Sequence, residues 1–147
     1  MLGELYAFQL LQREWGEQVV RLDAWRSENR LKLFPLASGE EDLTNDRAGF
    51  DFSFTHKGIT WCVEVKSTVG DEPRFELGTS EVRAAKERAG SDTERWRILR
   101  MKGLASEQPT YDLLPNPFEG AHRERFKIHR AGMKLSYQQV PKEEFTN

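Results

Sequence analysis

Two runs of alternating residues, joined by a glycine-containing turn, constrain this chain most. Residues 50–55 read Phe-Asp-Phe-Ser-Phe-Thr, and residues 59–68 alternate again after His56-Lys57-Gly58. Because successive side chains of a strand point to opposite faces, each run has an apolar face and a polar face. Two such runs on either side of a short turn predict an antiparallel hairpin.

The predicted hairpin gathers charged side chains on one face. If Trp61 and Val63 are buried on the same side as the phenylalanines of the first run, then Asp51, Glu64 and Lys66 meet on the other side. We expect that side to be polar. Carboxylate oxygens suit a hard divalent cation, and an ammonium beside them suits a phosphodiester. Glu-x-Lys in a strand is nevertheless common, and it is usually an exposed, charge-alternating face.

Size and composition set modest bounds. The 147 residues predict one domain that spans residues 1–147. The net charge of −2 and pI of about 6.0 argue against a chain that binds nucleic acid by bulk electrostatics, although local basic patches are compatible with it. A single cysteine, Cys62, excludes an internal disulfide or a cysteine-based zinc site. Without a signal peptide or a long apolar span, we expect a soluble, cytoplasmic protein with no membrane contact.

The remaining elements follow from periodicity and turn signals. Leu5, Phe8, Leu11 and Trp15 lie at helical spacing before Gly16. Glu4 shares that stripe, so it either points toward a site or simply favours the helix dipole. We predict a helix over 2–15, strands over 19–22, 74–77 and 96–101, a loop over 38–48, a helix from a Thr79 or Ser80 cap to about Ala89, loop or edge structure over 106–120, and a closing hairpin of 125–130 with 134–140.

These motifs, in this order, carry a family resemblance. They are Gly3-Glu4-x-x-Ala7-Phe8, Gly49-x-Asp51, Glu64-Val65-Lys66-Ser67, Phe75-x-Leu77-x-x-Ser80-Glu81 with Ala85, and Leu114-x-Asn116-Pro117. The chain resembles the PD-(D/E)XK nuclease superfamily over roughly residues 2–118. Within it, the chain is most similar to the restriction-endonuclease-like family named for the plant NO VEIN C-terminal domain. Each motif is short, and their order makes the resemblance specific.

The resemblance implies an α/β fold with a restriction-endonuclease-like core. That core is a mixed β-sheet flanked by helices, in the order helix, three-stranded meander, helix and strand, here with a C-terminal hairpin extension. The resemblance also implies that Asp51, Glu64 and the Val65 carbonyl bind Mg²⁺, for which Mn²⁺ can substitute. Lys66 would contact the attacking water or the phosphate. Glu4 would complete the site, and Glu81 would be catalytic or structural.

The chemistry explains these residue types. A bound Mg²⁺ would offset charge on the phosphodiester and lower the pKa of a bound water. Carboxylates beside Lys66 favour its charged form, so we expect orientation and charge stabilisation from Lys66 rather than general-base catalysis.

Other polar groups are weaker candidates for a functional role. His56, His122 and His129 lack metal-ligand spacing, and Cys62 lacks a clear base partner, so we assign no catalytic role to them. Cations that could contact phosphate are Arg83 and Lys86 in the second helix, and Arg123, Arg125, Lys127 and Arg130 near the C-terminus. In a strand, Arg125, Lys127 and His129 would share one side, whereas the alternative is an ordinary solvated face.

The sequence therefore predicts a metal-dependent DNA endonuclease domain. By analogy with the family, we expect it to be a module of a larger protein, with an ATPase or helicase-like partner and a role in defence against foreign DNA. A homodimer would supply two sites for cutting both strands. A noncatalytic DNA-binding or protein-docking module is the alternative. An RNA-directed nuclease is a third interpretation, with Trp61, Trp96 and Tyr111 as either stacking platforms or core.

Overall fold

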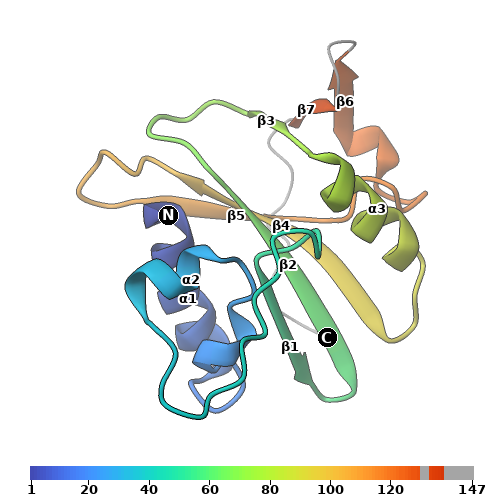
Figure 1. Cartoon of the computed structure of the whole chain (residues 1–147). Helices are drawn as coiled ribbons and strands as arrows, with labels where there is room; N and C mark the ends of the chain where they lie inside the picture. Colours follow the sequence, from blue (N-terminus) through green and yellow to red (C-terminus); the bar gives the residue numbers. More distant parts are fainter. Residues whose placement is uncertain (130–132, 138–147) are drawn as a thin grey trace.

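The computed structural model describes residues 1–129 and 133–137 (Figure 1). Its elements, in chain order, are α1 (Leu2–Trp15), η1 (Leu22–Ala24), α2 (Asn29–Leu33), β1 (Phe52–His56), β2 (Ile59–Ser67), β3 (Arg74–Glu76), α3 (Thr79–Arg88), β4 (Glu94–Lys102), β5 (Thr110–Leu114), η2 (Arg123–Arg125), β6 (Phe126–His129) and β7 (Lys134–Tyr137). Within the described residues, no helix is long and apolar enough to cross a membrane.

The strands form two sheets of an α/β fold. The larger sheet has the order β1-β2-β4-β5, in which β2 and β4 are parallel and the outer pairs are antiparallel. A small antiparallel sheet has the order β3-β7-β6. Figure 1 shows α1 and α2 on one side of the larger sheet and α3 on the other. This arrangement confirms the α/β class and the mixed sheet flanked by helices.

The hairpin that the alternating runs predicted is present. β1 and β2 pair from Phe52↔Val63 to His56↔Ile59, so His56 belongs to the strand rather than to the turn. The turn is Lys57-Gly58, with φ of 50° and 78°. Two consecutive residues with positive φ are typical of the tight turn that matches strand twist. On one face, Phe52, Trp61 and Val63 join the core beneath α1.

We had expected the opposite face of the sheet to be polar, but it is only partly so. Cys62, Ile98 and Leu114 are buried there, in a second core that includes Ala84 and Ala85 of α3. The prediction was wrong because the alternation of one hairpin does not reveal that a later helix will cover its second face. The apolar middle of this face therefore separates the charged groups around Glu64 and Lys66 from a polar end with Ser53, Thr55 and Thr60.

The predicted strand over 19–22 is absent, and with it the three-stranded meander. The N–H groups of Val19 and Val20 donate to the Gly16 carbonyl, and η1 follows. Local turns thus satisfy a backbone that could otherwise have paired with a strand. Beside β1 the chain makes an isolated bridge, Trp25↔Phe52. Since β3 pairs with β7, the meander is a two-stranded hairpin.

The other elements agree with expectation or extend it. The helix over 2–15 and the strand at 96–101 are α1 and β4, and β5 is the edge strand within 106–120. Asn116, fully buried after β5, donates from Nδ2 to the Ala85 carbonyl at 2.7 Å. β6 and β7 form the closing hairpin, although its residues 130–132 and 138–140 lie outside the described part.

Candidate functional site

Asp51 is fixed where the chain enters β1. Just before it, Gly49 has φ of 86°, and its carbonyl accepts a hydrogen bond from Trp96 Nε1 at 2.9 Å. The Asp51 N–H donates to the Val63 carbonyl at 2.9 Å. Its Oδ2 accepts a hydrogen bond from the Val65 N–H at 2.8 Å. The carboxylate therefore lies over the end of β2.

β2 contributes Glu64 and Lys66, two residues apart on one face. Glu64 is only 5% exposed, and its Oε1 lies 3.1 Å from Lys66 Nζ. Between them, Val65 presents its N–H to Asp51. The N–H and C=O groups of one strand residue point to the same side, so the Val65 carbonyl also faces the Asp51 edge. Two carboxyl groups and a main-chain oxygen thus converge beside an ammonium.

Glu81 joins this cluster from the first turn of α3. Its two carboxylate oxygens accept hydrogen bonds from Lys66 Nζ at 2.9 and 3.0 Å. Oε2 also accepts one from the Gly78 N–H at 2.7 Å. The helix cap is therefore Gly78 rather than the predicted Thr79 or Ser80. Glycine has no side chain to cap with, so the helix start is satisfied by Glu81 reaching back.

Glu4 points into the protein from α1. It is 8% exposed, and Trp25 Nε1 donates to its Oε1 at 3.0 Å while Asn29 Nδ2 donates to its Oε2. The carboxylate is therefore buried within the protein, and it also lies in the first turn of α1, where it favours the helix dipole. Trp25 and Asn29 were not foreseen as supports, because the segment from 22 to 33 has no periodic pattern that places it beside α1.

The electrostatics of the cluster are those of buried, crowded carboxylates. Burial and the charge of Glu4 raise the pKa of Asp51 to about 7. The hydrogen bond from the Val65 N–H acts in the other direction and lowers this pKa, but it is outweighed. Burial and the charge of Asp51 also raise the pKa of Glu64 well above its usual value. Burial alone would lower the pKa of Lys66, but Glu64 and Glu81 outweigh it and raise that pKa. Full ionisation of Asp51 and Glu64 would therefore place more buried negative charge here than Lys66 alone offsets.

The pKa of Glu81 is shifted in the opposite direction from that of Glu64. Burial opposes ionisation of Glu81, yet hydrogen bonds from Glu64 and Lys66 lower its pKa below the usual value. The same contact with Glu81 helps to raise the pKa of Glu64. Glu81 therefore favours its charged form opposite Lys66, whereas the surroundings of Glu64 favour its neutral form.

The donor set suits a hard cation, although it is not a complete protein cage. Within residues 1–129 and 133–137, no three His, Cys, Asp or Glu side chains are grouped to hold a metal ion. A site here would use Asp51, Glu64 and the Val65 carbonyl, with water at the remaining positions. Mg²⁺ commonly binds through one or two carboxylates and retains several waters. The residues present therefore fit Mg²⁺ or Mn²⁺.

The predicted phosphate contacts fall into two groups. On α3, Arg83 is exposed and donates to the Arg47 carbonyl at 3.0 Å, while exposed Lys86 lies 5.3 Å from the Phe118 ring centre. In the second group, Arg123, Arg125 and Lys127 are exposed on η2 and β6. Arg125 belongs to a 3-10 turn, so strand alternation does not align it with Lys127 as we predicted. Arg130 lies outside the described residues.

The histidines and the cysteine have structural surroundings. His56 packs edge-on against the Trp15 ring at 4.8 Å between centres. His122 Nε2 lies 3.7 Å from Glu119, and the side chain of His129 is outside the described part. Cys62 is 1% exposed in the second core, and burial raises the pKa of its thiol. A thiol that is harder to ionise is a poorer nucleophile.

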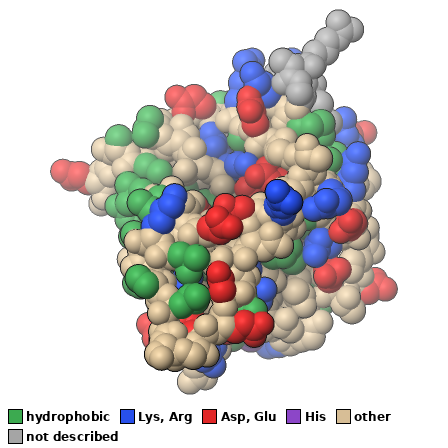
Figure 2. All heavy atoms as spheres, viewed as in Figure 1, with side chains coloured by type: hydrophobic (Ala, Val, Ile, Leu, Met, Phe, Trp, Pro, Cys, Tyr) green, Lys and Arg blue, Asp and Glu red, His purple; other side chains and the backbone are tan. Residues whose placement is uncertain are grey.

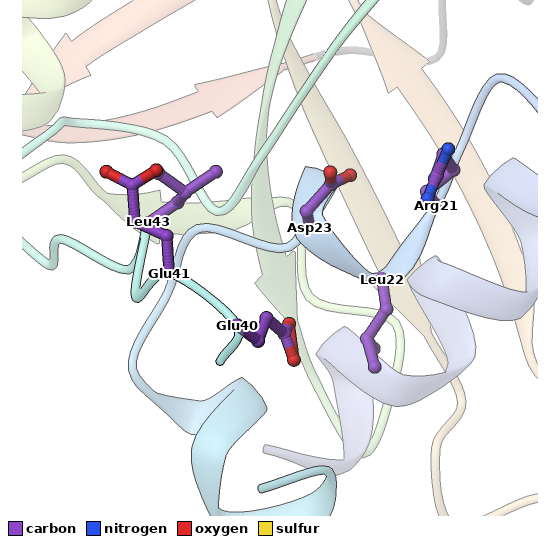
Figure 3. Close-up of a pocket in the computed structure, with 6 residues that line it drawn as sticks. All are labelled: Arg21, Leu22, Asp23, Glu40, Glu41 and Leu43. Carbon is purple, nitrogen blue, oxygen red and sulfur yellow. The ribbon is translucent and has the colours of Figure 1, made fainter. Parts of the chain in front are cut away.

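A separate surface cavity of about 350 Å³ lies beside η1. Figure 3 shows its lining, which comes from η1 with the residue before it and from the loop at 38–48. The lining residues are Arg21, Leu22, Asp23, Glu40, Glu41 and Leu43. Glu40 is already paired with Arg30 at 2.7 Å. None of the predicted site residues lines this cavity, so it is distinct from the Asp51 cluster.

The raised pKa values predict how pH changes the stability of the metal-free protein. Between about pH 4 and pH 7 the unfolded chain has lost the protons of Asp51 and Glu64 while the folded protein retains them. The folded state then binds more protons, so its stability falls as pH rises. The other shifted carboxyl groups in the described residues, namely Glu40, Asp42, Glu72 and Glu81, have lowered pKa values and act at the acidic end of this window or below it. We expect the Tm in a chelating buffer to fall from pH 5 to pH 8, and a rising Tm would contradict this assignment.

No family model, curated protein or solved structure matches this chain.

Proposed function

We propose that this protein is a metal-dependent DNA endonuclease domain of the PD-(D/E)XK type, centred on Asp51, Glu64 and Lys66. One observation carries the proposal: the Asp51 carboxylate, held by the Val65 N–H, and the buried Glu64 carboxyl group of β2 lie beside a paired lysine, and burial raises the pKa of both acids. Burying like charges together is costly, and a domain with a purely structural role has no need of it. Such a cluster is typical of a site that receives a cation.

The proposed metal ligands are Asp51, Glu64 and the Val65 carbonyl. When bound, Mg²⁺ or Mn²⁺ would offset charge on the phosphate and lower the pKa of a bound water. Asp51 is held ready by the Val65 N–H at 2.8 Å, which fixes one of its oxygens and leaves the other for the cation. Glu64 would release its proton and its contact with Lys66 to bind.

Lys66 would orient the water or the phosphate and stabilise charge on it. Its two carboxylate neighbours raise its pKa, so the ammonium stays protonated near neutral pH. A protonated lysine cannot accept a proton from water. It can donate hydrogen bonds to phosphate oxygens on which negative charge develops. This favours a charge-stabilising role over that of a general base.

The α3 cations would contact the DNA backbone. Arg83 and Lys86 follow Glu81 on the same helix and are exposed. Figure 2 shows Lys and Arg side chains over the region that α3 occupies in Figure 1. Exposed cations beside a cluster of this kind suit phosphate contacts, which position a duplex without reading its sequence. Arg123, Arg125 and Lys127 would add a second ridge, and Arg130 stays a prediction.

The order of elements supports the family resemblance. A helix, a hairpin that carries Asp51 and Glu64, a second helix and a strand parallel to β2 follow one another, as that core requires. The first meander strand is missing, which is the main departure. We further propose a partner with an ATPase or helicase-like module, a homodimer for double-strand cutting, and a role in defence against foreign DNA. These extensions come from the family alone.

One observation makes RNA a less suitable substrate than duplex DNA. Two of the three candidate stacking platforms, Trp61 and Trp96, are 2% and 0% exposed, so neither can stack on an unpaired base, and the third, Tyr111, is half-buried. A noncatalytic docking module is the remaining alternative. Such a module would use its exposed lysines and arginines for binding and would not use the Asp51 cluster for cleavage.

A cleavage assay tests the proposal. Supercoiled plasmid, linear duplex and single-stranded RNA are incubated with Mg²⁺, Mn²⁺ or chelator, beside a Lys66→Ala variant. We expect metal-dependent nicking of plasmid that falls about a hundredfold in the variant, because one charge-stabilising donor is lost. Lys57→Ala, in the β1–β2 turn, is the matched control and should cleave normally. Equal duplex binding without cleavage by both proteins would favour the docking module, and preferential RNA cleavage would favour the third interpretation.

A further inference from the structure

Lys66 has two carboxylate partners, which differ in the element that carries them and in the number of oxygens that contact the ammonium. Glu64 lies on the same strand and contacts Lys66 through one oxygen at 3.1 Å. Glu81 comes from α3 and receives hydrogen bonds from Lys66 on both oxygens, at 2.9 and 3.0 Å. The ammonium therefore has a two-oxygen contact with a residue that is not among the proposed metal ligands.

The Glu81 carboxylate is itself anchored. Its Oε2 accepts the Gly78 N–H at 2.7 Å, so the side chain is folded back onto the start of α3. A carboxylate in the first turn of a helix is further stabilised by the helix dipole. Glu81 is half-buried, at 19% side-chain exposure, which limits competition from water. Its position thus depends on α3 and not on Lys66 or on a cation.

Metal binding would affect the two partners of Lys66 differently. In the metal-free protein Glu64 contacts Lys66, but a cation between Asp51 and Glu64 would draw that carboxylate away. Without another anchor, the flexible lysine side chain would either swing toward solvent or continue to compete with the cation for Glu64. A second, independently fixed carboxylate avoids both outcomes.

We infer that Glu81 is a positioning residue, which holds the Lys66 ammonium at the reaction centre when a metal ion takes the Glu64 carboxylate. This role rests on the proposed function for its catalytic consequence. Its structural half, that Glu81 alone suffices to hold Lys66, can be tested whether or not the protein cleaves DNA.

Substitutions at the two glutamates separate the anchors. Glu81→Gln removes the charge, while its amide oxygen can still accept the Gly78 N–H, so α3 keeps its cap. Glu64→Gln removes the Glu64 charge that a metal ion would take from Lys66, without needing the metal. The measurement is the rate at which Lys66 is modified by an amine-reactive acetylating reagent, read by mass spectrometry of its peptide. An ion-paired lysine reacts slowly because its nitrogen must first leave the pair.

The expected pattern is specific. Lys66 stays protected in Glu64→Gln, and it reacts about tenfold faster in the Glu64→Gln, Glu81→Gln double variant. In Glu81→Gln alone, protection persists in chelator and is lost when Mg²⁺ is added. If Glu64→Gln exposes Lys66 as fully as the double variant does, or if the double variant leaves it protected, Glu81 is not the anchor and the inference is overturned.

A kinetic measurement tests the catalytic half. We expect Glu81→Gln to lower kcat for plasmid nicking about tenfold at saturating Mg²⁺, with KM for DNA unchanged. Adding more Mg²⁺ should not restore the wild-type kcat to the Glu81→Gln variant. A wild-type kcat in this variant would overturn the role. If the wild-type protein neither binds Mg²⁺ nor cleaves DNA, the proposed function fails, and the comparison of Glu64→Gln with the double variant still decides the anchor.

Discussion

Asp51→Asn should abolish cleavage and at the same time make the metal-free protein more stable. We expect metal-dependent nicking to fall about a thousandfold, which corresponds to roughly 4 kcal/mol of lost transition-state stabilisation. The reason is that asparagine supplies a neutral oxygen where the proposed cation needs a charged one. Its side-chain oxygen can still accept the Val65 N–H, so the local structure is retained.

The gain in stability follows from the same charge. With a pKa of about 7, Asp51 is costly to ionise in the folded protein near neutral pH. Removing that cost should stabilise the metal-free protein by about 2 kcal/mol, or raise its Tm by roughly 5 °C for a domain of this size. The fall in Tm between pH 5 and pH 8 should also be smaller in this variant. Thermal unfolding in chelator at pH 7.5 measures the gain.

Asp46→Asn provides the matched control. Asp46 also accepts a backbone hydrogen bond, from the Glu28 N–H at 2.8 Å, but in an exposed loop. We expect this variant to cleave like the wild type and to show no gain in Tm. A loss of Tm in Asp51→Asn, or full activity in it, would mean that the residue 51 carboxylate is structural and is not a metal ligand.

The placement of the three central residues of the candidate site could be predicted from the sequence because strand alternation is a local property. Asp51, Glu64 and Lys66 were placed on one face by side-chain parity and a short turn, and the register of β1 with β2 has that parity. The partners of these residues could not be predicted in the same way. Trp25 and Asn29 reach Glu4 across a long separation in sequence, and no periodic pattern announces such a contact.

The errors in the predicted fold have the same origin. Val19 and Val20 have the composition of a strand, but the Gly16 carbonyl accepts their N–H groups and no strand forms. The second core was missed because the helix that covers it is contributed from later in the chain. The Gly78 cap was missed because Ser and Thr are the usual side-chain caps, whereas here the glutamate three residues on reaches back.

Gly49→Ala is the second substitution for which we expect a large effect, this time on folding. A Cβ on Gly49 would lie 2.3 Å from the Ser80 carbonyl oxygen and 2.6 Å from the Ala84 Cβ. Neither the helix backbone nor the short alanine can move aside without displacing α3. The residue also has φ of 86°, which is unfavourable for alanine. Together, strain and collision should cost about 4 kcal/mol and lower the Tm by roughly 10 °C.

Gly39→Ala separates the two causes. Gly39 has a similar φ of 81°, but a Cβ there would meet no atom within 4 Å. This control should therefore lose only the strain contribution, about 1 kcal/mol. The difference in Tm between the two variants measures how tightly the Gly49 turn packs on α3. That contact fixes Asp51 relative to Glu81, so equal losses in both variants would mean that the turn and helix are not held together and the cluster is not rigidly assembled.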